Sequence, residues 1–118
     1  MTSHWEGMPI TLLESMALGK PIVISDCSSS VRRVMGDKLC NVIDDAEKFC
    51  ERTKYGYLMR QNNLVNYSEF ILDAWVNSIS ELLLDNNYYS NCSRAASLKS
   101  KEYDVDKIVK KWDEMIRI

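Results

Sequence analysis

The sequence predicts an α/β domain in which a few parallel strands are followed by a helical C-terminal half. Leu12, Leu13, Met16 and Ala17 recur at helical spacing near the N-terminus. The run from Pro21 to Ser25 that follows is apolar and β-branched, which is typical of a buried parallel strand. From Tyr67 onward, apolar residues recur every three or four positions almost to the end of the chain.

Composition limits the protein to one globular domain and excludes several classes of function. The 118 residues are 46% hydrophobic and 27% charged, with a formal charge of −2 at pH 7. Scattered Lys and Arg residues give no basic surface for nucleic acid. No apolar run is long enough to span a membrane, and no secretion signal is visible, so we expect a cytoplasmic location, or one at the inner face of a membrane.

Cysteines and histidine show no metal-binding pattern. The four cysteines lack the spacing of a zinc site or of a disulfide framework, so we expect reduced, mostly packed thiols and no metal. His4 is the only histidine, and we interpret it, with Trp5, as a loop residue rather than a catalytic one.

The first helix and its flanks carry the candidate chemistry. Pro9 suits the first turn of a helix, Gly19 suits its end, and Asp26 ends the strand behind it. Glu6 precedes the helix and Glu14 lies in its second turn, so the two carboxylates can flank one ligand. Unpaired N–H groups at the helix start, those of Ile10, Thr11 and Leu12, form a site for an anion such as a pyrophosphate. A sugar nucleotide fits this arrangement, because it has a diphosphate in its middle and hydroxyl groups at both ends.

One segment runs from Glu6-Gly7-Met8-Pro9 through Glu14 and continues with Ser15-Met16-Ala17-Leu18-Gly19-Lys20-Pro21-Ile22-Val23. It resembles the E-x7-E signature of family 4 retaining glycosyltransferases with the GT-B fold. The resemblance is close over residues 3 to 26 and looser, but continuous, to the C-terminus. It implies an incomplete Rossmann-like half-domain, a single partial domain over 1–118 with an α/β part at 1–66 and C-terminal helices at 67–118.

In that family the first Glu contacts the donor sugar, main-chain N–H groups hold the diphosphate, and the second Glu binds the ribose. The resemblance therefore implies a nucleotide-sugar partner and a donor site made of Glu6, Gly7, Met8, Ile10, Thr11 and Glu14. Glu6 is the catalytic candidate because it would orient the sugar, and neither Glu is assigned as a general base. No cofactor is implied beyond the donor substrate.

The resemblance also implies that the chain is a piece of a longer enzyme. A start at Met1 would leave no room for the strands expected to flank Pro21 to Ser25, nor for the basic pair that neutralises the donor phosphates in the family. The acceptor-binding domain precedes this one in the family. Where the family commonly has a glycine pair, this chain has Cys27-Ser28-Ser29-Ser30, which predicts a serine cap for a helix near Val31. For Arg32 and Arg33 on that helix we expect a solvated face, with at most one of them near a diphosphate.

The later elements are predicted from pattern alone. Leu39 to Ile43 has strand character, Asp44 to Arg52 suggests two helical turns, and Tyr55 to Met59 suggests a strand with a polar exit at 60–63. An amphipathic core helix is expected to bury Phe70, Ile71, Ala74, Trp75, Ile79, Leu82 and Leu83, with Glu69, Asp73, Asn77 and Glu81 on its other face. Asp85-Asn86-Asn87 should end it. A second helix is expected over about 88–100, with Tyr89, Cys92, Ala96 and Leu98 or Lys99 on its packed side.

The last helix should start at a cap on Asp104 or Asp106 and carry an apolar stripe of Val105, Ile108, Val109, Trp112, Met115 and Ile116. In the family this helix crosses onto the partner domain, and Trp112 resembles the aromatic residue found there. Without that domain we expect either self-association or a sticky, marginally stable monomer.

Three functions remain open from the sequence. The first is the donor-binding part of a glycosyltransferase of polysaccharide biosynthesis that transfers a glycosyl group to a sugar or lipid-linked acceptor, inactive as an isolated chain. The second is a non-catalytic remnant or interaction module that keeps only the fold elements. An unrelated doubly wound α/β signalling domain is the third, poorly supported because Asp26 alone does not make an acidic pocket.

Overall fold

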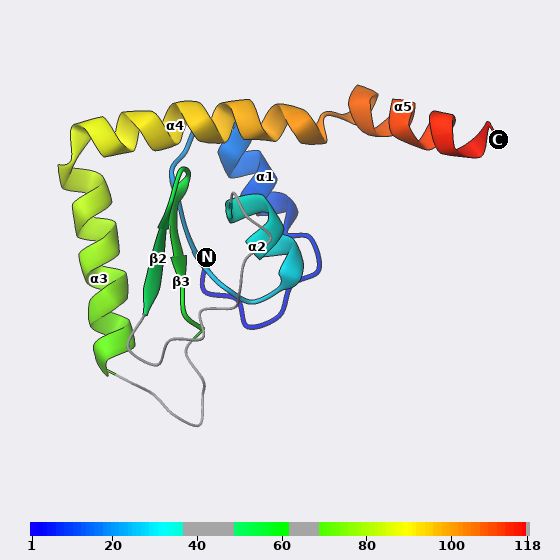
Figure 1. Cartoon of the computed structure of the whole chain (residues 1–118). Helices are drawn as coiled ribbons and strands as arrows, with labels where there is room; N and C mark the ends of the chain where they lie inside the picture. Colours follow the sequence, from blue (N-terminus) through cyan, green and yellow to red (C-terminus); the bar gives the residue numbers. More distant parts are fainter. Residues whose placement is uncertain (37–48, 62–68, 118) are drawn as a thin grey trace.

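The computed structural model describes residues 1–36, 49–61 and 69–117, and forms a mixed α/β structure (Figure 1). The chain order of the described elements is α1 (Ile10–Ala17), β1 (Ile22–Ser25), α2 (Ser29–Met35), β2 (Cys50–Thr53), β3 (Gly56–Met59), α3 (Glu69–Leu84), α4 (Asn86–Ser100), the 3-10 helix η1 (Lys101–Tyr103) and α5 (Val105–Ile116). The prediction of an α/β domain with a helical C-terminal half is confirmed.

Three strands form the described sheet in the order β1-β3-β2. Strands β1 and β3 are parallel, with Ile22 opposite Gly56 and Ser25 opposite Met59, so the two predicted parallel strands pair directly. Strand β2 runs antiparallel to β3 and joins it through a turn at Lys54 and Tyr55. The sheet is therefore mixed, with a hairpin at one edge.

Strand β2 corrects the expectation of a helix over Asp44 to Arg52. Residues Cys50–Thr53 are extended and pair with Gly56–Met59, so the helical reading is wrong for the end of that segment. The Thr53 hydroxyl donates to the carbonyl of Gly56 and accepts from the N–H of Tyr55, which closes the hairpin. The remainder of that segment, and the strand expected at Leu39 to Ile43, lie outside the described residues, as do positions 62 and 63 of the exit loop.

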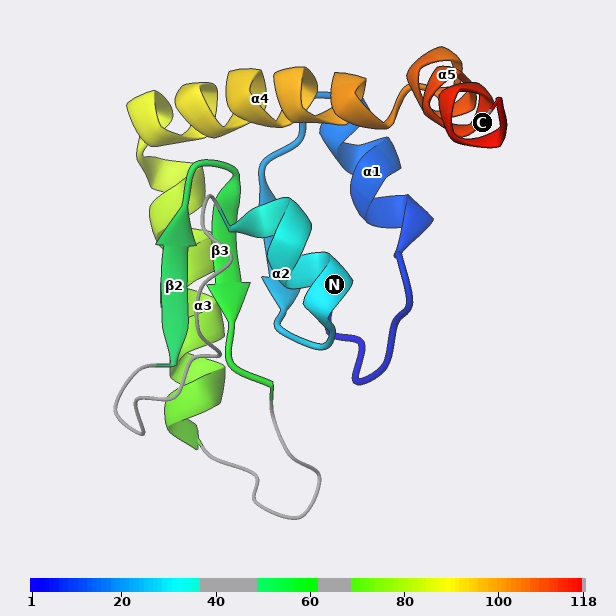
Figure 2. The same cartoon turned by 45° about the vertical axis from the view of Figure 1, so that its right-hand side comes forward.

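Helices cover both faces of the sheet (Figure 2). Alternate strand residues point to opposite faces, as the period of a strand requires. Ile22, Ile24 and Leu58 face α1 and α2, in a cluster that includes Leu12, Met16, Val31, Val34, Met35, Tyr55 and Ala96. Tyr57 and Met59 point the other way, toward Leu82, Tyr88 and Cys92 of α3 and α4.

The ends of the first two helices follow the sequence signals. Pro9 is the N-cap of α1 rather than its first helical residue, and Gly19 leaves the helix with a φ of 65°, its N–H donating to the carbonyl of Met16. The hydroxyl of Ser28 caps α2 by accepting from the N–H of Val31, so the predicted serine cap is confirmed. Helix α2 begins at Ser29, slightly before the expected start.

Helix α3 is less buried than its pattern predicted. Ile71, Ser78 and Leu82 are buried, whereas Phe70, Ile79 and Leu83 are 71%, 41% and 65% exposed. The described part of the sheet has three short strands, which cover one narrow side of α3. The expectation that all seven apolar residues are core residues is therefore wrong.

Helices α4 and α5 start at aspartate caps. Asp85 accepts from the N–H of Tyr88, and Asp104 accepts from the N–H of Asp106, as expected for the last helix. In α4 the buried residues are Tyr88, Cys92 and Ala96, and Leu98 is exposed. Helix α5 has no buried residue and extends away from the remaining elements (Figure 1).

Candidate functional site

The loop before α1 is fixed against β1 by hydrogen bonds. Ser25 donates its hydroxyl to the carbonyl of Ser3 at 2.5 Å, and its N–H donates to the carbonyl of Met1 at 2.9 Å. The Ser3 hydroxyl in turn donates to Oε1 of Glu6 at 2.9 Å. The carboxylate of Glu6 is thus oriented by a chain of contacts that starts at the carboxyl end of a parallel strand, where α/β folds bind ligands.

A second contact holds the same loop from the α2 side. The hydroxyl of Ser28 lies 3.3 Å from the carbonyl oxygen of Gly7, to which it donates, while it also caps α2. Gly7 and Met8 are both exposed, and a Cβ added at Gly7 would meet no atom within 4 Å. The loop therefore presents its outer side to open space.

The start of α1 has unpaired donors. Pro9 carries no N–H, and its carbonyl accepts from the N–H of Leu12 at 3.1 Å, so of the three expected donors Leu12 is taken. The N–H groups of Ile10 and Thr11 have no acceptor among the residues that the structure describes, and no side chain caps the helix. Two backbone donors and the positive end of the helix dipole are therefore available to an anion.

Glu14 lies one turn beyond these donors. A rise of about 1.5 Å per residue puts it roughly 6 Å along the axis from Ile10, on the same side of the helix because the two are four positions apart. Both side chains are exposed, while Leu12 and Met16 face the core. Within the described part of the chain, nothing pairs with the Glu14 carboxylate, which is free to accept hydrogen bonds from a ligand.

An ion-pair network lies beside this loop, at the end of β1. Arg32 of α2 contacts the Asp26 carboxylate at 2.6 Å and Glu51 of β2 at 3.3 Å, and the side chains of Arg32 and Asp26 are only 12% and 13% exposed. Burial alone would lower the pKa of Arg32, but the hydrogen bond and charge of Asp26 and the charge of Glu51 raise it. The expected solvated face is therefore wrong for Arg32, while Arg33 is exposed.

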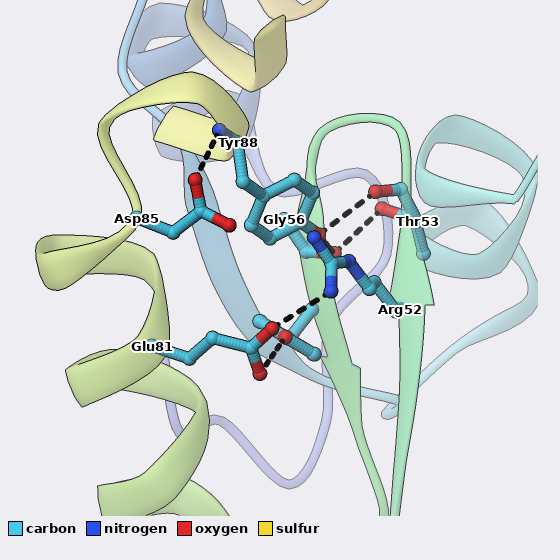
Figure 3. A network of polar contacts seen from close by, with 7 residues as sticks. Arg52, Thr53, Gly56, Glu81, Asp85 and Tyr88 are labelled. Atoms are coloured by element: carbon cyan, nitrogen blue, oxygen red, sulfur yellow. Dashed lines mark hydrogen bonds and ion pairs between the residues drawn. The ribbon is translucent and has the colours of Figure 1, made fainter. Parts of the chain in front are cut away.

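A polar cluster at the other side of the sheet ties the hairpin to the corner between α3 and α4 (Figure 3). Glu81 accepts from Tyr57 at 2.5 Å and from Arg52 at 2.7 Å, and the Arg52 guanidinium lies 3.7 Å from the centre of the Tyr88 ring. The Tyr88 hydroxyl lies 2.9 Å and 2.8 Å from the carbonyl oxygens of Thr53 and Gly56. Each of these polar side chains has at least one partner within the cluster, so we assign the cluster to fold stability rather than to ligand binding.

Sequence reasoning missed both networks, and only the first left a signal. Asp26 ends a strand and Arg32 lies in the helix that follows it. Opposite charges on adjacent elements could have indicated an ion pair between them. The second network joins residues up to 35 positions apart in the chain. Neither spacing nor periodicity indicates such contacts.

His4 lies near the candidate site but contacts the exit of β3. The side-chain amide of Gln61 donates to the His4 carbonyl and lies 3.3 Å from Nδ1 of the ring. Trp5 is 90% exposed. The loop role expected for both residues stays the simplest interpretation.

Among the described residues, no group of three or more His, Cys, Asp or Glu side chains is placed to hold a metal ion. Cys27, Cys50 and Cys92 are free thiols, and Cys40 lies outside the described residues. No helix in the described ranges combines the length and the apolar character that a membrane crossing requires.

Comparison with known proteins gives an independent view of the same segment. Residues 1–55 match the family model described as glycosyl transferases group 1. Uncharacterized glycosyltransferases of Methanocaldococcus jannaschii and Haemophilus influenzae are 26% and 27% identical to the chain, over 98% and 95% of its length. The chain spans 30% and 25% of the lengths of these two relatives. No solved structure is a significant match. The α/β part that holds Glu6, the start of α1 and Glu14 is therefore similar to group 1 glycosyl transferases.

Proposed function

We propose that this chain is part of the donor-binding domain of a retaining, metal-independent family 4 glycosyltransferase with the GT-B fold. The observation that carries the proposal is the start of α1, where the N–H groups of Ile10 and Thr11 have no acceptor in the described structure and lie between Glu6 and Glu14 in the chain. The match of residues 1–55 to glycosyl transferases group 1 supports the same ligand class.

Each residue of the site has a role that its position supports. The N–H groups of Ile10 and Thr11 would bind the diphosphate, because unpaired helix donors and the helix dipole both favour a negative charge. Glu14 would accept hydrogen bonds from two vicinal ribose hydroxyls. Glu6, oriented by Ser3, would contact the donor sugar, and Gly7 and Met8 would line the approach to it.

In a full enzyme these contacts would assist transfer of the glycosyl group to a sugar or lipid-linked acceptor, as in polysaccharide biosynthesis. The bond between the sugar and the diphosphate breaks, so negative charge grows on the leaving diphosphate. Helix donors aimed at that charge stabilise the transition state more than the ground state. We place such an enzyme in the cytoplasm or at the inner face of a membrane.

The proposed domain is one partial unit, with an α/β part at 1–66 and C-terminal helices at 67–118. Its acceptor-binding partner would be a domain that precedes it in a longer enzyme. The uncovered face of α5 supports a partner of some kind, either that domain or another copy of the chain, because contiguous apolar surface is costly in water.

A non-catalytic remnant or interaction module is the alternative. It is favoured by the small size of the described sheet, three strands of four residues each. Under this alternative the fold elements are retained, but the loop at Glu6 and the start of α1 bind no nucleotide.

Calorimetric titration of the chain with UDP, GDP, ADP and their sugar conjugates distinguishes the two functions. Donor binding predicts saturable affinity for one nucleotide, weakened in Glu14→Ala by about 1–3 kcal/mol because charged hydrogen bonds are lost. Glu69→Ala, which removes an exposed carboxylate on α3, is the matched control and should bind as the parent does. Absence of binding by a chain with an intact circular dichroism spectrum would favour the remnant.

A further inference from the structure

The loop that carries Glu6 is hydrogen-bonded to the end of β1 and to the start of α2, which lie beside it (Figure 2). The hydroxyl of Ser25, the last residue of β1, donates to the carbonyl of Ser3 at 2.5 Å. The hydroxyl of Ser28, the N-cap of α2, donates to the carbonyl of Gly7 at 3.3 Å. Ser3 precedes Glu6 and Gly7 follows it, so the loop is held on both sides of its carboxylate.

The segment between these two serines is itself fixed. The N–H of Asp26 donates to the carbonyl of Met59 at 2.7 Å, which continues the pairing of β1 with β3 past the strand ends. The carboxylate of Asp26 is paired with Arg32 of α2 at 2.6 Å, and both side chains are mostly buried. The N–H of Cys27 donates to the carbonyl of Ser25 at 2.9 Å. Contacts from a segment with so many bonds of its own can hold a neighbouring loop in one position.

Ser25 acts on Glu6 through Ser3. The side chain of Ser25 is buried, since the residue is only 3% exposed, and a buried hydroxyl is costly unless it has a partner. The carbonyl of Ser3 is that partner. The hydroxyl of Ser3 in turn donates to Oε1 of Glu6 at 2.9 Å. The bond from Ser25 therefore fixes the residue whose side chain orients the carboxylate.

Ser28 uses its hydroxyl for two purposes at once. The oxygen accepts from the N–H of Val31 at 3.2 Å and so caps α2, while the hydroxyl proton is donated to the carbonyl of Gly7. These two bonds require different residue types. Glycine can replace a serine cap at a small cost in helix stability, but it has no hydroxyl to donate to the loop. The contact with Gly7 can therefore be removed while the start of α2 is kept.

We propose that Ser25 and Ser28 are positioning residues that hold Glu6 in place for the sugar of a nucleotide-sugar donor. The inference rests on the proposed function, in which Glu6 contacts that sugar. A loop that is ordered before the ligand arrives loses less conformational entropy on binding, so the affinity is higher. The start of α1 and Glu14 bind the diphosphate and the ribose in that function. Loss of either serine should therefore weaken binding of the sugar and leave binding of the nucleotide unchanged.

Calorimetric titration of the full chain compares two ligands, the nucleotide diphosphate that the parent binds among UDP, GDP and ADP, and its sugar conjugate. We expect Ser28→Gly to raise the dissociation constant of the sugar conjugate about three- to tenfold, as the loss of one hydrogen bond predicts. The dissociation constant of the plain nucleotide should change by less than about twofold. Ser25→Ala should give the same difference between the ligands. An equal rise for both ligands, or no rise for the sugar conjugate, would overturn the proposal.

Three further variants show whether Ser28 acts through Glu6. Ser28→Thr keeps the hydroxyl and should bind both ligands as the parent does. Ser29→Ala removes the exposed hydroxyl one position along and is the matched control. In a chain that already carries Glu6→Ala, the change Ser28→Gly should cause no further loss of affinity for the sugar conjugate, because the carboxylate that Ser28 positions is gone. A second loss of the same size in that chain would refute action through Glu6.

Backbone amide relaxation, measured by NMR on the ligand-free chain, tests the loop independently of any ligand. The order parameters of Gly7 and Met8 should fall in Ser28→Gly, while those of α2 stay as in the parent because glycine is an adequate cap. Unchanged order parameters in the loop would overturn the positioning role, whether or not a nucleotide binds. If the loop loosens but the parent binds none of the nucleotides, the proposed function fails and the positioning of the loop stands.

Discussion

Gly56 opens β3 at a point where the backbone of β1 leaves no room for a side chain. Its φ is 134°, and a Cβ there would lie 1.8 Å from the carbonyl oxygen of Ile22. We expect Gly56→Ala to lower the free energy of unfolding by about 3 kcal/mol or more, since both backbone strain and a backbone clash result. Gly7→Ala, at an open position, should change it by less than about 0.5 kcal/mol. Urea unfolding measures the stability of both variants. Equal free energies of unfolding for Gly56→Ala and Gly7→Ala would contradict the close pairing of β1 with β3.

Ile10 permits a test of one backbone donor without loss of the helix. Proline is tolerated at the first helical position, and the extended Pro9 before it, with ψ of 108°, is compatible with a following proline. We expect Ile10→Pro to keep the fold but to weaken nucleotide diphosphate binding by about 1 kcal/mol or more, because one N–H donor is lost. Ile10→Ala retains the donor and is the control. Equal affinity of the two variants, measured by calorimetry, would argue against phosphate at this helix start.

At the residue scale, features that depend on one residue, such as helix caps, were predicted better from the sequence than contacts between two side chains. The Ser28 cap, the Asp104 cap and the end of α1 at Gly19 each depend on local chemistry, and all three are confirmed. The pairing of Arg32 with Asp26 depends on the turn that joins β1 to α2, and the side-chain positions in that turn do not follow from spacing. The roles of Glu6 and Glu14 stay predictions, because they require a ligand.

At the scale of elements, the turn between β1 and α2 is stabilised by a charge pair that is mostly buried. Arg32→Met would leave the Asp26 carboxylate unpaired at 13% exposure, so we expect a loss of about 2–4 kcal/mol in the free energy of unfolding. Arg33→Met removes the same charge one position away, at an exposed site, and should have little effect. Chemical denaturation at neutral pH compares them. Similar values for the two variants would mean that the ion pair adds no stability.

The hairpin and the corner between α3 and α4 share a dependence on alkaline pH. Burial, then the hydrogen bond to Glu81, raises the pKa of Tyr57 well above its usual value of 10.0, and burial with the Cys92 contact does the same for Tyr88. A pKa raised in the folded state means that stability is full below pH 10 and falls as pH rises above it. Each tyrosine contributes a slope of up to about 1.4 kcal/mol per pH unit.

Urea unfolding between pH 8 and pH 11.5 measures this slope. Tyr57→Phe should reduce the slope, because only the hydroxyl proton of Tyr88 then couples folding to pH. Tyr103→Phe, whose hydroxyl has no hydrogen-bond partner in the described residues, is the control. An unchanged slope in Tyr57→Phe would contradict a buried, neutral Tyr57 in the folded chain.

Elements with a strong period were predicted, and elements defined by their partners were not. Strands β1 and β3 and the three C-terminal helices follow from apolar runs, stripes and caps. Strand β2 was misread because Glu51, Arg52 and Thr53 have no strand pattern of their own, and the pairing with β3 decides their conformation. The buried side of α3 was misjudged for a related reason. Periodicity identifies an apolar side, but the area of the sheet determines how much of it is covered.

For the molecule as a whole, α5 should contribute to stability only through association. It buries no side chain, and its main contacts within the chain are with η1. If the apolar face of α5 packs on another copy of the chain, the full chain should therefore melt at a temperature that rises with protein concentration, by about 2–4 °C for each tenfold increase. A chain truncated after Asp104 should melt at a temperature that does not depend on concentration and that equals the value for the dilute full chain. If the truncated chain melts well below the dilute full chain, α5 stabilises its own molecule, and its apolar face is not available to a second copy.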